Sequence, residues 1–191
     1  MPFRRIWMHI SLAILLPSAL VGCIKTGRLE LAPRAEQQSR ATRLTLAPLA
    51  FVRFCMRNEQ QCQPAGQPDA IVPATPQALA TIENVNSQVN ARIRPSDAET
   101  EWRINPASGN CNDYVVSKRQ ALLAQGFPSS ALLINVVRTP SGQGHLVLVV
   151  RTSGEDLVLD NLTASVRSVP ETSYLWIKRQ TSSDPRQWET A

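Results

Sequence analysis

The change of hydrophobic period after residue 126 constrains the fold more than any other feature of the chain. Before it, apolar residues recur at three- and four-residue steps, which predicts an amphipathic helix over 76–95. These residues are Leu79, Ile82, Val85, Val89 and Ile93. After it come the β-branched runs "SALLINVVR", "HLVLVVR" and "DLVLDNL", separated by "TPSGQG" and "TSGE", which predict strands. Helices followed by an antiparallel sheet predict an α+β domain.

A second helix is predicted over 111–125. Asn110 is a suitable N-cap, Gly126 suits the position after the helix, and Pro128 prevents continuation. The first residue of this helix is Cys111. Further on, "YLWIKRQ" is predicted as the last strand, which closes the ordered part of the chain.

The N-terminus has the layout of a secretory signal. Arg4 and Arg5 precede an apolar run over 6–20, shorter than the roughly 20 residues that a membrane-spanning helix needs. "LVGC" also resembles a bacterial lipobox ending at Cys23, which would be lipidated; ordinary cleavage near the same place is the alternative. We therefore expect the periplasm or cell envelope, with Cys23 as a candidate membrane anchor.

The domain boundaries follow from these segments. We expect a signal peptide over 1–23, a flexible linker over 24–46, which is polar and lacks periodicity, and one domain over 47–191. The net charge of +5 is spread along the chain, and Tyr and Phe are few. A nucleic-acid partner is therefore not expected.

The chain has four cysteines, and Cys23 belongs to the signal region. Cys55 and Cys62 lie in one polar segment, "FCMRNEQQC", and are expected to form a disulfide in an oxidising compartment. A zinc pair is the alternative, but no neighbouring Cys or His cluster would complete four ligands. Cys111 is then left without a partner, so it is either a liability or a working thiol.

The mature domain has one histidine, His145, and its spacing from Asp160 is informative. If residues 153 and 154 form a hairpin tip, Asp160 lies opposite Val147, on the same face as His145 and one diagonal step away. Such a pair has Cβ atoms roughly 7 Å apart, within reach of a carboxylate and an imidazole. The carboxylate would fix the imidazole tautomer and stabilise its protonated form.

Cys111, His145 and Asp160 together suggest nucleophilic catalysis. The start of a helix and a neighbouring imidazolium both favour a thiolate, and an acid behind the imidazole orients it. Each residue also has a structural interpretation. Cys111 can be a small buried hydrophobe, His145 a half-exposed residue at a strand end, and Asp160 a turn residue.

Three ordered motifs, "NCNDYVVSKRQALLAQGFP", "GHLVLVV" and "LVLDNL", resemble the bacterial transglutaminase-like cysteine proteinases, whose best-understood branch is the periplasmic LapG-type proteases. The flanking "VNSQVNARI", "EWRINP", "YLWIKRQ" and "DPRQW" extend the resemblance over 51–188. The resemblance implies a papain-like transglutaminase core, in which the Cys-bearing helix packs on an antiparallel sheet.

The resemblance also implies roles for the residues. Cys111 would be the nucleophile, His145 the general base and acid, and Asp160 the residue that orients His145. The backbone N–H of Cys111 and the side chain of Trp102 are candidate oxyanion donors. The implied substrate is a protein, such as a surface adhesin cut near its N-terminus.

The sequence departs from the family at the flanks of the cysteine. Calcium-dependent LapG-type enzymes carry acidic residues there, whereas this chain has Asn110 and Asn112, and only Asp113 keeps its charge. Because calcium prefers several negatively charged oxygen ligands, we expect no cofactor and at most a vestigial calcium site at Asp113.

We therefore predict an exported cysteine endopeptidase. Acyl transfer to an amine, as in transglutaminase-type cross-linking, is one alternative, because the same three residues serve it. A non-catalytic envelope-binding module is the other alternative.

Overall fold

The computed structural model describes residues 43–97 and 100–191, which belong to one compact unit over 40–191. The predicted signal peptide, the lipidation candidate Cys23 and most of the predicted linker lie outside the described residues. Within the described ranges, no helix is long and apolar enough to cross a membrane.

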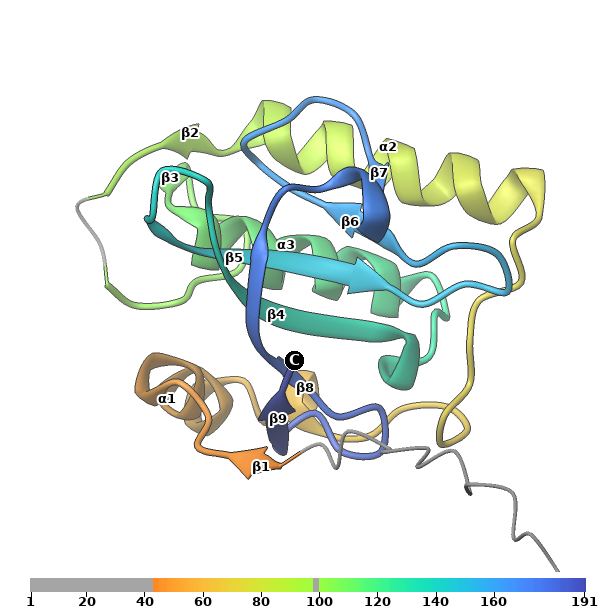
Figure 1. Cartoon of the computed structure of the whole chain (residues 1–191), viewed down its shortest axis with the longest axis horizontal. Helices are drawn as coiled ribbons and strands as arrows, with labels where there is room; N and C mark the ends of the chain where they lie inside the picture. Colours follow the sequence, from red (N-terminus) through yellow and green to blue (C-terminus); the bar gives the residue numbers. More distant parts are fainter. Residues whose placement is uncertain (1–42, 98–99) are drawn as a thin grey trace, which may run out of the picture. The chain divides into compact units, whose positions relative to one another are not determined.

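A seven-stranded antiparallel sheet forms one layer of the domain, with strand order β1-β9-β8-β4-β5-β6-β7 (Figure 1). A separate pair, β2 and β3, is parallel and joins the end of one helix to the start of another. The strands are β1 (Leu44–Thr45), β2 (Arg94–Pro95), β3 (Ser108–Gly109), β4 (Leu132–Arg138), β5 (Gly144–Val150), β6 (Leu157–Leu159), β7 (Arg167–Ser168), β8 (Leu175–Gln180) and β9 (Trp188–Thr190).

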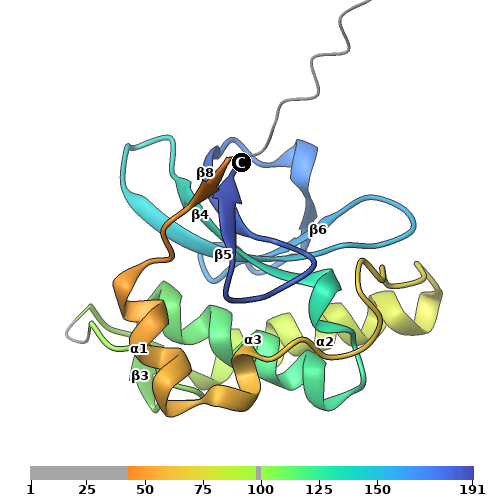
Figure 2. The same ribbon diagram turned by 90° about the horizontal axis from the view of Figure 1, so that it is seen from below.

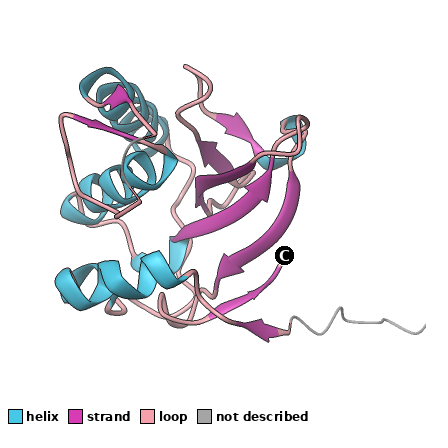
Figure 3. Ribbon diagram, turned by 90° about the vertical axis from the view of Figure 1, so that its left-hand side faces the viewer, coloured by secondary structure: helices cyan, strands magenta, loops and turns pink. Residues whose placement is uncertain are grey.

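Three α-helices lie on one face of this sheet, as Figures 2 and 3 both show. They are α1 (Leu49–Arg57), α2 (Pro76–Arg92) and α3 (Cys111–Ala124), with the short 3₁₀ turns η1 (Glu59–Cys62), η2 (Ser129–Ala131) and η3 (Val169–Glu171). Helix α3 packs against α2 and β5. The apolar stripe of α2, from Ile82 to Val89, supplies part of the main core. The predicted α+β class, with the Cys-bearing helix on an antiparallel sheet, is confirmed.

The helix ends follow the capping signals in the sequence. Thr75 accepts a hydrogen bond from the N–H of Ala78 at 3.2 Å, and Pro76 occupies the first turn of α2. At the end of α3, Gly126 has a φ of 85°, a conformation that glycine adopts without strain. Helices α2 and α3 therefore begin at the predicted residues, Pro76 and Cys111.

The structure differs from the sequence prediction at both ends of the domain. Leu44 and Thr45, placed in the predicted linker, pair with β9, so the ordered part begins before residue 47. Strand β8 is not the last strand, because the chain turns back through Trp188–Thr190 to pair with it. Both missed strands are two or three residues long, too short to show a period in the sequence.

The hairpin formed by β5 and β6 has the predicted register. Leu148 lies opposite Leu159 and Val150 opposite Leu157. Extending this register by one residue puts Asp160 opposite Val147, two positions from His145. Side chains along β5 alternate between two clusters, with Leu146 and Leu148 in the main core and Val147 and Val149 in a smaller cluster that also contains Val158.

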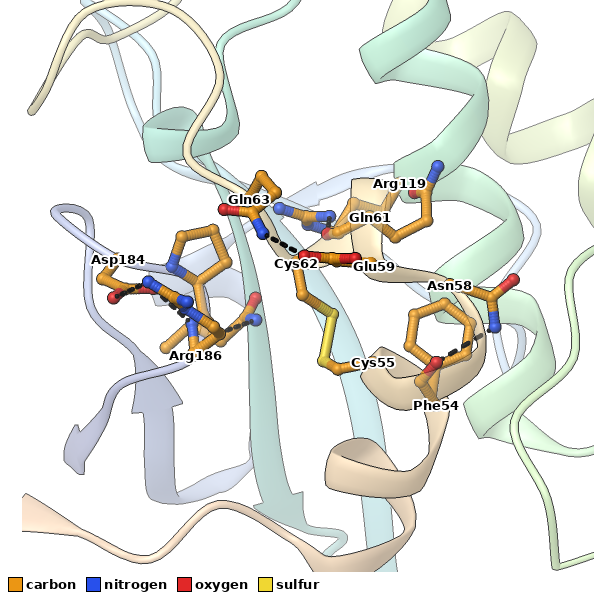
Figure 4. The surroundings of a disulfide bond; sticks show 12 residues. Phe54, Cys55, Asn58, Glu59, Gln61, Cys62, Gln63, Arg119, Asp184 and Arg186 are labelled. Atoms are coloured by element: carbon orange, nitrogen blue, oxygen red, sulfur yellow. Dashed lines mark hydrogen bonds and ion pairs between the residues drawn. A yellow bond between two sulfur atoms is a disulfide. The ribbon is translucent and has the colours of Figure 1, made fainter.

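Cys55 and Cys62 form a disulfide that joins the last turn of α1 to η1 (Figure 4). The predicted pairing is thus the one in the structure, and Cys62 is buried. The bridged segment is tied to α3, because Arg119 Nη1 donates a hydrogen bond to the carbonyl of Gln61 at 2.5 Å.

Candidate active site

Cys111 is the first residue of α3 and the free cysteine of the described chain, with a partly exposed side chain. Asn110 precedes it as the N-cap, and its Oδ1 accepts a hydrogen bond from the N–H of Asn112 at 3.0 Å. The pairing of β3 with β2 fixes Gly109, two residues before the thiol. Cys111 therefore lies where the unpaired N–H groups of a helix start are concentrated.

Asp113 completes a capping box and is fully buried. Its Oδ2 accepts the N–H of Asn110 at 3.1 Å, its Oδ1 accepts the N–H of Arg103 at 2.7 Å, and Arg103 Nη2 lies 3.4 Å from Oδ2. A Cβ on Gly109 would lie 2.1 Å from Asp113 Oδ2, so this approach requires glycine. Asp113 thus anchors the start of the helix to the preceding loop.

His145 and Asp160 are joined by a hydrogen bond of 2.8 Å between Nε2 and Oδ1. Their side chains are only 5% and 1% exposed, so water does not compete for this contact. Since Nε2 serves the carboxylate, Nδ1 is the ring nitrogen left for the thiol, and Cys111 lies close enough to His145 to raise its pKa. The structure therefore brings together the three residues singled out in the sequence.

The environment of His145 favours its protonated form. Burial lowers the pKa of His145, but the hydrogen bonds to Asp160 and Cys111 outweigh it and raise the pKa to about 9. At neutral pH the ring is therefore an imidazolium, held between a carboxylate and a thiol. An imidazolium in this position stabilises a thiolate on one side and can give up its proton on the other.

Asp160 stays ionised in spite of its burial. Burial raises its pKa, but hydrogen bonds from His145, the N–H of Leu162 at 3.0 Å and the hydroxyl of Tyr174 lower the pKa to about 2. Nη2 of Arg167 adds an ion pair at 3.8 Å. A permanent carboxylate behind His145 is what stabilisation of an imidazolium requires.

Two polar residues from the helices support the segment that carries Asp160. Asn90 on α2 donates to the backbone carbonyls of Asp160 and Thr163, at 2.9 and 3.3 Å, and Asn86 donates to that of Ala164 at 3.2 Å. The alternation of asparagines with apolar residues in α2 was visible in the sequence, but their partners lie 70 to 78 residues away. Sequence spacing could not reveal this contact.

Lys118, two turns after Cys111, is fully buried, and its Nζ has no hydrogen-bond partner among the described residues. The ammonium lies 5.8 Å from the ring centroid of Tyr114. Burial lowers the pKa of Lys118 to about 7, while the negative charge of Asp160 opposes that shift. A buried lysine without a partner is rare, and nothing in its sequence context distinguishes it from a surface residue.

Trp102, the sequence candidate for an oxyanion donor, lies in the hydrophobic core. Its ring centroid is 5.4 Å from that of Phe51 and 6.2 Å from that of Phe54, both on α1. The described contacts of the ring are thus with core aromatics, and its role as an oxyanion donor remains a prediction.

Solved structures with a similar fold include LapG of Legionella pneumophila. One LapG structure matches with a TM-score of 0.50 and 22% identity over 58% of this chain and 66% of LapG. A calcium-bound LapG matches with a TM-score of 0.50 and 23% identity over 56% of this chain and 66% of LapG. This chain therefore spans slightly less than two thirds of LapG, and the likeness shows the fold. No curated protein matches the sequence.

The prediction that no cofactor takes part is contradicted by these structures. One of the LapG structures is calcium-bound, so LapG, which shares this fold, takes a calcium ion. The prediction considered only the acidic residues beside the cysteine, whereas calcium also accepts amide and backbone carbonyl oxygens.

Acidic side chains alone do not form a metal site in the described residues. Between 43 and 97 and between 100 and 191, no group of three His, Cys, Asp or Glu side chains is placed to hold a metal ion. Both oxygens of Asp113 already accept backbone N–H groups.

The family assignment comes from the sequence. The profile of the bacterial transglutaminase-like cysteine proteinases (BTLCP) matches residues 41–191, which contain every element described above. The match includes Cys111, His145 and Asp160. The chain therefore belongs to the bacterial transglutaminase-like cysteine proteinase family.

Proposed function

We propose that this protein is an exported cysteine endopeptidase that cleaves a peptide bond in a cell-envelope or surface protein. Cys111 is the nucleophile and His145 the general acid and base. Asp160 orients His145 and stabilises its protonated form. The observation that carries the proposal is the buried hydrogen bond between Asp160 and His145, together with the interaction of His145 with Cys111 at the start of α3. The family and its LapG relatives support a protein substrate.

The first half of the reaction forms an acyl-enzyme. The thiolate of Cys111 attacks the scissile carbonyl carbon and forms a tetrahedral oxyanion. His145 gives its proton to the leaving amine nitrogen as the C–N bond breaks, which leaves a thioester on Cys111 and a neutral imidazole. The raised pKa of His145 ensures that this proton is present at neutral pH.

The second half returns the enzyme to its starting state. His145, now neutral, takes a proton from water as the water oxygen attacks the thioester carbonyl. The C–S bond then breaks, so that Cys111 leaves as a thiolate and the imidazolium is restored. Because Asp160 remains a carboxylate throughout, it holds the ring in one orientation for both proton transfers.

The start of α3 supplies a donor for the oxyanion. The N–H groups of a first helical turn have no carbonyl partner within the helix. The carbonyl of Asn110 accepts from Asp113 and Tyr114, and the N–H of Cys111 is the group nearest to the reacting sulfur. We assign this N–H as one oxyanion donor, in a position where a single donor contributes about a hundredfold or more to the rate.

Export is part of the proposal and rests on the signal-like N-terminus and on the Cys55–Cys62 disulfide. Disulfides persist in oxidising compartments such as the periplasm. Lipidation of Cys23 would hold the protease at a membrane. A surface adhesin is one substrate that such a location would offer.

The test combines thiol reactivity with a search for products. The rate of iodoacetamide labelling of Cys111 is measured from pH 4 to 9 in the wild type and in His145→Ala. Envelope proteins of the source bacterium are then incubated with the wild type or with Cys111→Ala, in calcium and in EGTA, and new N-termini are identified by mass spectrometry.

Each outcome separates the alternatives. New N-termini that require Cys111 establish hydrolysis, whereas cross-linked peptides would establish acyl transfer instead. A thiol that labels at the same rate in both variants, with no product in either metal condition, would refute catalysis and leave a binding module.

A further inference from the structure

Only one oxygen of the Asp160 carboxylate faces His145. Oδ1 accepts from Nε2 of His145 at 2.8 Å and from the N–H of Leu162 at 3.0 Å. Oδ2 accepts the hydroxyl hydrogen of Tyr174 and lies 3.8 Å from Nη2 of Arg167. Since Asp160 is almost completely buried, these protein groups take the place of water on both oxygens.

Tyr174 contacts both partners of the charge pair. It lies just before β8, and its ring centroid is 5.9 Å from that of His145, with the planes tilted by 55°. The guanidinium of Arg167, from β7, lies 5.9 Å from the same ring. Tyr174 therefore joins the imidazole, the carboxylate and the arginine into one cluster at the edge of the sheet.

The hydroxyl of Tyr174 can act only as a donor to this carboxylate. Burial and the hydrogen bond to Asp160 raise the pKa of Tyr174 to about 12, so the hydroxyl keeps its hydrogen over the working range of a protease. A hydrogen bond from a neutral hydroxyl to a buried carboxylate is charge-assisted and strong.

A carboxylate can rotate about χ2 unless hydrogen bonds restrain both of its oxygens. The χ2 angle of an aspartate has a broad distribution, so hydrogen bonds to one oxygen alone restrict the carboxylate plane less than hydrogen bonds to both. With Oδ2 fixed by Tyr174, rotation of the carboxylate would break a strong hydrogen bond. Oδ1 then stays directed at Nε2, and the imidazole plane is set relative to the thiol.

We propose that Tyr174 is a positioning residue of this protease: its hydroxyl fixes the Asp160 carboxylate and its ring restricts His145, so that the imidazolium is aligned with Cys111. Arg167, on β7, forms an ion pair with the same Asp160 oxygen, Oδ2. The inference builds on the proposed function, but the alignment itself is a property of the folded protein that can be measured without a substrate.

The test uses the two tyrosines of the chain, Tyr114 and Tyr174, as a matched pair. Tyr174→Phe removes the hydroxyl that holds Asp160. Tyr114→Phe removes a buried hydroxyl that donates to the carbonyl of Ile93 at 2.5 Å and not to His145 or Asp160. Each change deletes one oxygen atom and keeps the ring, so the variants differ only in which hydrogen bond is lost.

Three measurements are made on each full-length variant. They are the low-field ¹H NMR signal of the imidazolium proton between His145 and Asp160 at pH 7, the rate of iodoacetamide labelling of Cys111, and kcat and KM on an identified substrate. We expect Tyr174→Phe to shift or broaden the proton signal, to slow labelling, and to lower kcat about ten- to a hundredfold with little change in KM. Tyr114→Phe should lower the melting temperature but leave all three measurements as in the wild type.

An unchanged proton signal, labelling rate and kcat in Tyr174→Phe would overturn the proposal and leave Tyr174 a structural residue. If that variant does not fold, Arg167→Gln tests the same oxygen, and an unchanged proton signal there would count against the proposal. If the wild type cuts nothing but Tyr174→Phe still displaces the proton signal, the proposed function fails and the positioning role stands.

Discussion

Replacing Asp160 with asparagine removes the charge that keeps His145 protonated while it changes the side-chain shape little. An amide can still bond to the ring, but it cannot stabilise an imidazolium as a carboxylate does. By presenting an N–H to the ring it can also select the wrong tautomer. The thiolate of Cys111 then loses its cationic partner.

The loss of protonation at His145 in Asp160→Asn can be worked out from the pKa of His145. The hydrogen bonds to Asp160 and Cys111 raise it from 6.5 to about 9 against the opposing effect of burial. Without the carboxylate, burial dominates and the pKa should return to 6.5 or lower. At pH 7.5 the protonated fraction of His145 would then fall from nearly complete to about one tenth or less.

The assay follows the His145 ring by NMR between pH 5 and 10, together with iodoacetamide labelling of Cys111 at pH 7.5. Asp156→Asn is the matched control, because Asp156 lies in the same hairpin and its carboxylate accepts the backbone N–H of Thr152 at 3.4 Å. We expect the pKa of His145 to fall by about two units or more in Asp160→Asn and labelling to slow with it. A pKa of His145 that stays near 9 in Asp160→Asn would refute the electrostatic account of the site.

Three further outcomes test the supporting structure. Lys118→Met should raise the melting temperature at pH 7, because burial lowers the pKa of Lys118 from 10.5 to about 7, a shift that corresponds to a few kcal/mol. Between pH 7 and 10.5 the unfolded chain binds one proton more than the folded chain, so the stability of the wild type should rise with pH over this window. The stability advantage of Lys118→Met should therefore fade toward pH 10.5. A difference in melting temperature between the two proteins that stays constant with pH would contradict this. Cys55→Ser with Cys62→Ser should cost about 2–3 kcal/mol of unfolding free energy in urea titrations, the value for closing so short a loop, whereas equal midpoints would show that the bridge is dispensable. Gly109→Ala should destabilise the start of α3, since its Cβ would lie 2.1 Å from Asp113 Oδ2, and wild-type stability and labelling of Cys111 in this variant would show that the loop can shift.

The elements that carry the reacting groups could be predicted because their signals are local. A cap, a glycine and a proline delimit α3, and the tip of one hairpin determines that Asp160, the residue after β6, lies near His145. The positions of Cys111, His145 and Asp160 follow from those two features.

The residues that support the site could not be predicted, because their contacts join distant segments. Tyr174 reaches Asp160 from a neighbouring strand connection, and Asn90 reaches it from a helix 70 residues earlier. Lys118 has the sequence context of a surface lysine in a polar helix. The calcium prediction failed for a related reason, since ligands for calcium need not adjoin the cysteine in sequence.

The sheet order places His145 and Asp160 in regions with different numbers of paired residues. His145 belongs to β5, which pairs with β4 along seven residues, whereas Asp160 follows β6, which has three paired residues, and β7 at the edge has two. Short edge pairings open at lower free energy than the centre of a sheet. Opening of this edge would carry the carboxylate away while Cys111 and His145 stay in place. A fraction of the folded molecules would then lack an aligned His145, and the amide hydrogens of β6 and β7 would exchange with solvent through this opening.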